Sequence, residues 1–183
     1  MGKFLTFTGA SGVGKTTLVK ELLKDPQFSL VTSITTRNSR PSDLPGEYEY
    51  VTDAKFDWLK CWNAFVWNFP YCENQYGTTY ESVNEAVKSP LYSVMILVPH
   101  AVSELRRYLK NEEALSSFYI RTPEDAVLRS RLEQRGEMRS TIEQRLEQSK
   151  GGDELAEKSG IPYTFITNNG TIEEVVTRVK GYL

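Results

Sequence analysis

An eight-residue motif near the start of the chain restricts the fold more than any other feature. The stretch Gly9-Ala10-Ser11-Gly12-Val13-Gly14-Lys15-Thr16 matches every fixed position of the phosphate-binding loop G-x-x-x-x-G-K-[ST]. The apolar run before it, residues 4–8, predicts a buried parallel strand, and leucine and valine at i, i+4 spacing predict a helix over 17–24. In this order of elements, backbone N–H groups surround a polyphosphate. The motif therefore predicts phosphate binding within an α/β domain.

Each polar group of the loop has an expected contact with the bound phosphates. Lys15 reaches the β- and γ-phosphate oxygens, and the Thr16 hydroxyl ligates Mg²⁺. A glycine-rich turn that binds nothing is the alternative, but the lysine, the hydroxyl and both flanking elements argue against it. The loop residues expected at the phosphates are Gly9, Ser11, Gly12, Val13, Gly14, Lys15, Thr16 and Thr17.

Length, charge and cysteine content are typical of a single globular domain. The chain has 183 residues and a net charge of −2, which creates no strong attraction to nucleic acid or to membranes. No apolar run reaches the roughly 18 residues of a membrane span, and Cys61 and Cys72 lack metal-ligand spacing. We therefore expect a cytoplasmic monomer or homodimer with free thiols that acts on small molecules, without membrane or free nucleic acid as a partner.

Strand and helix signals alternate along the chain outside residues 33–88. Apolar, β-branched runs predict strands at 28–32, 91–98, 117–120 and 163–167, and the strongest, 91–98, is expected in the centre of the sheet. The segments between them are long enough for right-handed crossovers. This order predicts a three-layer α/β fold of the P-loop NTPase type, in which helices cover both faces of a parallel sheet.

Capping residues mark the starts of three helices in the second half of the chain. The pattern is a hydroxyl that accepts from the first turn, followed by proline or by glutamate three residues later. It occurs at Thr122-Pro123, at Ser140 with Glu143, and at Thr171 with Glu174. Gly136 and Gly151-Gly152 are expected to interrupt the helices between these starts.

Residues 33–88 have a different texture and predict an inserted lobe. Tyrosines, tryptophans and prolines crowd together here, with short strand signals and one helix that begins near Asp53. Trp67 is a candidate for a binding pocket. The aromatic residues are otherwise expected to form the small core of the lobe: Trp58, Trp62, Phe65, Trp67, Phe69 and Tyr71.

Two groups of arginines supply cations beyond the loop. Arg37 and Arg40, followed by two tyrosines, suit a phosphomonoester, because guanidinium groups bind phosphate oxygens in pairs and a phenol adds a hydrogen bond. The second group surrounds Gly136 and could close over a triphosphate: Arg131, Arg135, Arg139 and Arg145. Taken alone, the first group also fits a solvated loop and the second a solvated helix.

Taken together, these motifs resemble the guanylate kinase family of nucleoside monophosphate kinases over nearly the whole chain. Besides the phosphate-binding loop and the arginine segment 131–145, the matching motifs are Ser33-x-Thr35-Thr36-Arg37-x-x-Arg40, Gly46-x-Tyr48-x-Tyr50-Val51, Tyr76-Gly77-Thr78 and Asn168-Asn169. The resemblance implies an ATP-dependent kinase with Mg²⁺ and one domain in three parts. These parts are a core (1–32, 89–136 and 149–183), an acceptor-binding lobe (33–88) and a lid (137–148).

The resemblance also implies roles for individual residues. The acceptor's phosphate would be held by Arg37, Arg40, Tyr48 and Tyr76. Asn168 would lie beside adenine, and Arg131 would contact the ATP phosphates. The implied catalytic residues are Lys15, Arg37, Arg131, Arg135 and Arg145.

Three positions depart from the family's guanine-binding pattern. Family members carry a glutamate where this chain has Trp67, and an Asp-x-Asp pair where it has Ile96 and Val98, whereas the hydroxyls of Ser33 and Thr78 remain. A site that no longer pairs with guanine's N–H groups loses discrimination of about 10⁴. We therefore expect these five residues to contact an acceptor base that presents carbonyl groups, such as thymine or a modified pyrimidine.

Two other functions stay open on the sequence alone. A phosphosugar kinase resembling ribose 1,5-bisphosphate phosphokinase would also lack the guanine carboxylates, although Arg40, Tyr48 and Thr78 favour a nucleotide. A non-catalytic binding module, like the guanylate-kinase-like domains of membrane scaffolds, would have lost the phosphate-binding loop that this chain keeps.

Overall fold

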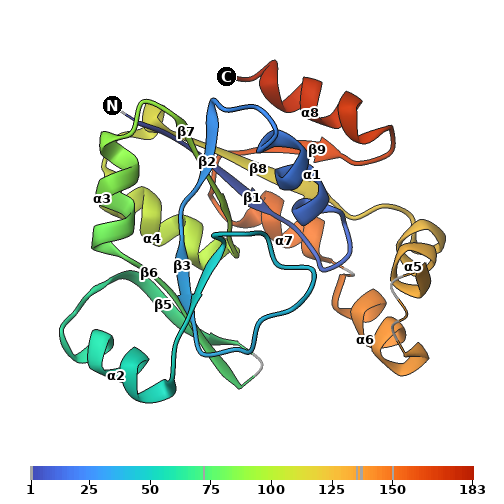
Figure 1. The fold of residues 1–183 in the computed structure, drawn as a ribbon. Helices are drawn as coiled ribbons and strands as arrows, with labels where there is room; N and C mark the ends of the chain where they lie inside the picture. Colours follow the sequence, from blue (N-terminus) through green and yellow to red (C-terminus); the bar gives the residue numbers. More distant parts are fainter. Residues whose placement is uncertain (1, 72, 135, 137, 150) are drawn as a thin grey trace.

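Two β-sheets organise the fold, which a computed structural model describes for residues 2–71, 73–134, 136, 138–149 and 151–183 (Figure 1). The larger sheet is parallel throughout, as predicted, with the order β2-β7-β1-β8-β9. Its strands are β1 (Lys3–Thr8), β2 (Phe28–Leu30), β7 (Tyr92–Ile96), β8 (Leu115–Arg121) and β9 (Tyr163–Thr167). The smaller, mixed sheet has the order β4-β3-β6-β5, from β3 (Ser33–Thr35), β4 (Tyr48–Tyr50), β5 (Phe65–Tyr71) and β6 (Asn74–Thr79).

Helices cover both faces of the parallel sheet and complete the predicted three layers. Helices α1 (Lys15–Leu22) and α8 (Ile172–Lys180) pack on one face, and α3 (Tyr80–Lys88) and α4 (Pro99–Leu109) pack on the other. The alternation of side chains along β1 accounts for this arrangement. Leu5 and Phe7 contribute to the first buried cluster and Phe4 to the second, and all three are fully buried.

The middle of the parallel sheet is β1, so the prediction that segment 91–98 lies there is wrong by one strand. Strand β1 pairs with β7 on one side and β8 on the other, and β2 borders β7. The apolar side chains Phe4, Leu5 and Phe7 are fully buried, whereas Tyr92 and Ile96 at the two ends of β7 are half-buried. Strand β1, which leads into the phosphate-binding loop, therefore occupies the most buried position in the sheet.

Helix α2 (Asp53–Cys61) packs on one face of the smaller sheet and starts where predicted, with the Thr52 hydroxyl accepting from the Lys55 N–H. Ile34, Phe56 and Phe65 form the core between them, and the two phenylalanine rings stack with centroids 4.7 Å apart.

The predicted aromatic core of the lobe is wrong for three residues. Trp58, Trp62 and Tyr71 are 58%, 71% and 56% exposed. Trp58 lies in α2 and Trp62, four residues later, is its C-cap, and both point away from the sheet because Phe56 occupies the inner face. Helix α2 has aromatic residues on two faces and can bury only one of these faces against the sheet.

A pair of helices, α5 (Asp125–Gln134) and α6 (Arg139–Ser149), forms a separate small unit at one side of the core (Figure 1). Its own buried cluster consists of Leu128, Leu132, Ile142 and Leu146. The glycines interrupt the helices as predicted. Gly136 and Gly151 both have φ of 73°, and α7 (Gly152–Lys158) begins directly after the second one. A short 3₁₀ turn (Glu112–Ala114) precedes β8.

The capping box at the start of α8 is confirmed. The Thr171 hydroxyl accepts from the Glu174 N–H, and the Glu174 carboxylate accepts from the Thr171 N–H. This exchange satisfies two of the backbone donors at the helix start that have no partner within the helix.

The other two helices start within three residues of the predicted places, but the predicted capping contacts are wrong. Helix α5 begins at Asp125, while the Thr122 hydroxyl donates to Asp153 instead of capping it. Ser140 lies inside α6, and Glu143 pairs with Arg129 of α5 at 2.6 Å. Contacts with neighbouring helices therefore override the local capping pattern at both places.

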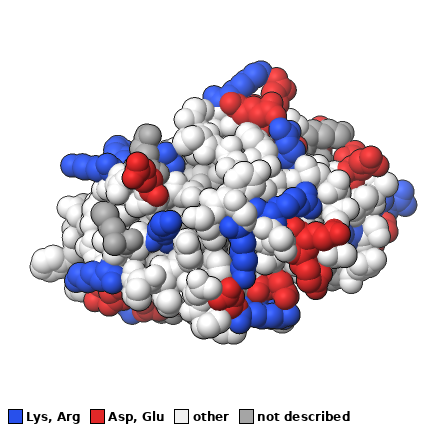
Figure 2. Space-filling view, turned by 90° about the horizontal axis from the view of Figure 1, so that it is seen from above, with Lys and Arg blue, Asp and Glu red and all other residues white. Residues whose placement is uncertain are grey.

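Charged side chains of both signs are interspersed on the face of the molecule that Figure 2 shows. None of the described helices has the length and apolar character that crossing a membrane requires. Cys61 is exposed and free, and Cys72 lies outside the described residues.

The core of the lobe can be tested with a matched pair of variants. We expect Phe56→Ala to lower the free energy of unfolding by about 3–5 kcal/mol, because it opens a cavity beside Phe65. Trp58→Ala on the opposite face of α2 should change it by less than about 0.5 kcal/mol. Denaturant titration measures both, and an equal loss in the two variants would contradict the assignment of the inner face.

Candidate active site

The phosphate-binding loop connects β1 to α1 and is closed from outside by helix α5. Gly12 has φ of 91°, and a Cβ there would lie 2.7 Å from Leu128 Cδ1 of α5. Val13, the next residue, is fully buried. The glycine therefore allows both the tight turn and the close approach of α5.

The Lys15 ammonium group lies back over its own loop. Its Nζ donates to the carbonyl oxygens of Gly9 at 2.7 Å and Ala10 at 2.8 Å. Thr16 and Thr17 follow in the first turn of α1, the former half-buried and the latter exposed. The ammonium group is thus held at the loop, within reach of a phosphate bound there.

Two residues from distant parts of the chain meet at the Val13 carbonyl. The Asn168 Nδ2 donates to it at 2.7 Å, and Arg131 Nη1 donates at 3.4 Å. The other guanidinium nitrogen of Arg131, Nη2, donates to the Asn168 carbonyl at 3.1 Å. The contacts bring these two predicted ATP-site residues together at the loop.

The lid helix α6 also contacts the loop. Arg145 Nη1 donates to Ser11 Oγ at 2.6 Å, and the Arg129–Glu143 ion pair holds α6 against α5. Arg139 is exposed at the start of α6, and Arg135 lies outside the described residues. Of the four arginines in the predicted group, the structure therefore places Arg131 and Arg145 at the phosphate-binding loop.

The register of the smaller sheet gathers the predicted acceptor residues on one face. Partners across the sheet are Ser33 with Tyr48 and Trp67 with Thr78, and the Ser33 and Thr78 hydroxyls lie 2.8 Å apart. A bulge between Phe65 and Trp67 lets Phe65 face α2 while Trp67 faces the opposite side. The acceptor face carries Ser33, Tyr48, Trp67, Phe69, Tyr76 and Thr78.

Arg37 lies beside this face, almost fully buried and paired with a carboxylate that the sequence analysis missed. Its Nη1 and Nη2 each donate to Asp43 at 3.0 Å, and its guanidinium carbon lies 5.3 Å from the Tyr48 ring centroid. Asp43 also accepts from the Arg40 N–H at 2.7 Å and from the Tyr50 hydroxyl at 2.7 Å. A buried arginine requires a carboxylate partner. Asp43, six residues further along the same loop, is the residue in the sequence that could have been identified as this partner.

The electrostatics of this cluster follow from burial and pairing. Burial opposes the charge on Arg37, but the hydrogen bonds to Asp43 outweigh it and raise the pKa of Arg37. Burial, with the Glu47 carboxylate nearby, raises the pKa of the Tyr48 phenol. Burial and Asp43 raise the pKa of Tyr50 to about 12. The arginine therefore stays charged and both phenols stay protonated at neutral pH, and the Tyr50 proton is donated to Asp43.

The Arg40 side chain is exposed at the surface of the same loop. Leu44, also in this loop, is buried in the same apolar cluster as Val13 and Leu18. The loop that carries the acceptor arginines is therefore anchored to the layer that carries the phosphate-binding loop.

The three positions that depart from the guanine-binding pattern differ in their surroundings, since Trp67 belongs to the second buried cluster and Ile96 packs against the first. Trp67 is 6% exposed, stacks on Phe69 with centroids 5.4 Å apart, and belongs to the same cluster as Leu97. Ile96 is half-buried at the end of β7, and Val98 is 39% exposed just before α4. The Trp67 indole N–H is buried without a hydrogen-bond partner.

The residues present offer Mg²⁺ one protein ligand, the Thr16 hydroxyl. Among the described residues, no three His, Cys, Asp or Glu side chains cluster as a metal site. Mg²⁺ keeps much of its water shell and binds phosphate oxygens directly. One hydroxyl beside the phosphates therefore suits this ion, as long as the nucleotide supplies further ligands.

Comparison with known proteins agrees with this geometry. The family model for guanylate kinase matches residues 1–183. The chain belongs to the guanylate kinase family.

Individual relatives agree with this assignment. A guanylate kinase from Nostoc sp. is 34% identical over 87% of this chain and 80% of its own length. One from Prochlorococcus marinus is 31% identical over 97% of this chain and 94% of its own length. The crystal structure of guanylate kinase from Anaplasma phagocytophilum has the same fold, with a TM-score of 0.73, 21% identity, and 99% and 84% of the two chains covered. Guanylate kinases are nucleoside monophosphate kinases, and this chain is an enzyme of that class.

The Arg37–Asp43 pair can be tested by its effect on stability. Burial raises the pKa of Asp43, but the hydrogen bonds from Arg37, Tyr50 and Arg40 outweigh it and lower the pKa below its ordinary value. We expect Asp43→Asn to reduce the free energy of unfolding by about 3–5 kcal/mol at pH 7, because it leaves a buried guanidinium unpaired.

The stability that the Arg37–Asp43 pair contributes should depend on pH in a defined direction. A depressed carboxyl pKa contributes stability above the pKa of the unfolded chain, about 3.9, and this contribution is lost as the pH falls through the folded value. The gap between the wild type and Asp43→Asn should therefore be full at pH 7 and narrow below about pH 4. Tyr50→Phe, which removes one of the four hydrogen bonds, is the milder control. A gap that stays constant down to pH 2 would contradict the pairing.

Proposed function

We propose that this enzyme transfers the γ-phosphoryl group of ATP to the phosphate of a nucleoside or deoxynucleoside monophosphate whose base is thymine or a modified pyrimidine. The observation that carries the choice of base is the chemistry at Trp67, Ile96 and Val98, where family members place carboxylates for guanine. The polar groups beside them are the Ser33 and Thr78 hydroxyls and the unpartnered Trp67 N–H. A hydroxyl or an indole N–H donates to a carbonyl oxygen, whereas guanine's ring N–H and amino group require acceptors.

On the donor side, the phosphates of ATP occupy the turn between β1 and α1. Lys15 exchanges its two loop carbonyls for β- and γ-phosphate oxygens. Arg131 and Arg145, already at the loop, neutralise the charge that spreads over the migrating group, and Arg135 is proposed to join them. The Thr16 hydroxyl would hold Mg²⁺ with phosphate oxygens and waters, and the ion would balance the triphosphate charge when bound.

On the acceptor side, lobe 33–88 presents a phosphate site and lid 137–148 covers the cleft. Arg37, Arg40, Tyr48 and Tyr76 are the proposed phosphate ligands, and the close Arg37, Tyr48 and Tyr76 side chains support their joint action. The Asp43 carboxylate keeps the Arg37 fork in a fixed plane before the acceptor arrives.

The transfer itself requires positioning and positive charge. An oxygen of the acceptor phosphate attacks the γ-phosphorus in line, the bond from this phosphorus to the β,γ-bridging oxygen breaks, and ADP leaves with that electron pair. Because the attacking oxygen is already ionised at neutral pH, the protein supplies no general base. Its contribution is to hold both phosphates together and to stabilise the shared charge.

A panel of acceptors with ATP tests the choice of base. We expect dTMP, UMP or a hydroxymethylpyrimidine nucleotide to exceed GMP and dGMP in kcat/KM, measured by ADP release, because guanine's donors find no acceptors. A clear preference for GMP would contradict the proposed base while leaving the kinase assignment intact. Phosphorylation of ribose 1,5-bisphosphate, with no nucleotide accepted, would favour a phosphosugar kinase instead.

Val98→Asp tests the same proposal from the protein side. Val98 is partly exposed, so a carboxylate there can stay hydrated. We expect the variant to raise kcat/KM for GMP relative to dTMP, because it returns one acceptor for guanine's N–H groups. Val98→Leu, which adds no hydrogen-bond acceptor, is the control. An unchanged ratio in Val98→Asp would argue that position 98 does not face the base.

A further inference from the structure

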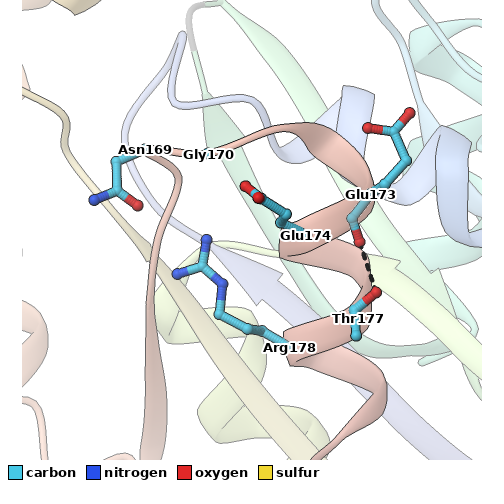
Figure 3. A pocket seen from close by; sticks show the side chains of 6 residues that line it. All are labelled: Asn169, Gly170, Glu173, Glu174, Thr177 and Arg178. Atoms are coloured by element: carbon cyan, nitrogen blue, oxygen red, sulfur yellow. Dashed lines mark hydrogen bonds between the residues drawn. The ribbon is translucent and has the colours of Figure 1, made fainter.

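The turn after β9 contains two asparagines whose surroundings differ sharply. Asn168 is 8% exposed, whereas Asn169 and Gly170 are exposed and line an open hollow of about 630 Å³. Figure 3 shows this hollow, with Glu174 and Arg178 of α8 opposite the turn. A residue that touches a ligand base from this turn would have to be accessible, which the Asn168 side chain is not.

Asn168 holds the phosphate-binding loop through its side chain and helix α5 through its backbone. The side-chain Nδ2 donates to the Val13 carbonyl at 2.7 Å, while the backbone carbonyl of Asn168 accepts from Arg131 Nη2 at 3.1 Å. The next loop residue, Gly14, leaves room for the amide, because a Cβ there would lie 2.4 Å from Asn168 Nδ2. The turn, the loop and helix α5 therefore meet at one buried hydrogen-bonded junction.

Pinning the Val13 carbonyl also orients the donor on the other side of the same peptide. In a planar trans peptide the C=O and the following N–H point in opposite directions. With the Val13 oxygen held toward Asn168 and Arg131, the Gly14 N–H points away from them. In a loop of this type, the N–H groups on that side are the ones that surround the phosphates.

We propose that Asn168 is a positioning residue for the donor phosphates, not a contact for the adenine base. Its side-chain amide fixes the Val13–Gly14 peptide so that the Gly14 N–H faces the phosphates, while its backbone carbonyl, which side-chain variants keep, accepts from Arg131. The inference rests on the phosphate-binding role of the loop and is independent of which acceptor base the enzyme prefers.

The proposal is tested by measuring the binding of two probes, ATP and inorganic tripolyphosphate, to the full chain by calorimetry. We expect Asn168→Ala to weaken both by the same factor, up to about 10², because the loss of one hydrogen bond to a charged group costs up to that much in affinity. Asn169→Ala, a change at the exposed neighbour, is the matched control and should leave tripolyphosphate binding unchanged.

Every outcome of this test decides the proposal. A loss confined to ATP would overturn it in favour of a base contact, and unchanged binding of both probes would reduce the role of Asn168 to folding. Thermal unfolding of each variant checks the fold, and Asn168→Ser, which keeps a short donor, should give an intermediate loss if the alanine variant does not fold. Because no acceptor is present, failure here is distinct from failure of the proposed base preference.

Discussion

The phosphate-binding loop imposes the constraint on which the rest of the structure depends. Its N–H groups can converge on a phosphate only if its carbonyl groups point away and find donors elsewhere. Asn168 and Arg131 supply them to Val13, while Lys15 donates to Gly9 and Ala10 in this structure and would leave them for a bound phosphate. The donors to Val13 come from the turn after β9 and from α5. The strand order places β8 and β9 on the side of β1 from which this turn can reach the loop.

On the proposed acceptor side, a buried guanidinium group has to be stabilised before any phosphate binds. Arg37 would be costly in this position without a partner, and Asp43 supplies one with bidentate geometry. The tyrosines around the pair add hydrogen-bond donors without adding negative charge at neutral pH. Leu44, in the same loop as Arg37, is buried in the apolar cluster beneath α1. The loop that carries Arg37 and the phosphate-binding loop are therefore packed on the same apolar cluster.

Features set by local interactions could be predicted from the sequence, and features set by distant partners could not. The loop, β1 and the capping box of α8 each depend on residues within about one turn of each other, and the structure confirms them. The face of α2 depends on which aromatic residue the sheet accepts, and spacing alone does not distinguish Phe56 from Trp58. Ser140 and Glu143 match a capping pattern, but Glu143 forms an ion pair with Arg129 on another helix instead.

Under the proposed function, the apolar residues at positions 67, 96 and 98 make physical sense as a set. Trp67 and Leu97 belong to one buried cluster, and Ile96, the residue before Leu97, packs against the other. A single carboxylate left beside that cluster, with no guanine to donate to it, would carry an uncompensated charge near apolar side chains. Replacing all three removes the cost altogether and leaves only hydroxyl and indole groups, which tolerate burial far better than a carboxylate. The proposed pocket would thus keep its phosphate end, where Arg37 and Asp43 are paired, and differ from the guanine-binding pattern only at the end that meets the base.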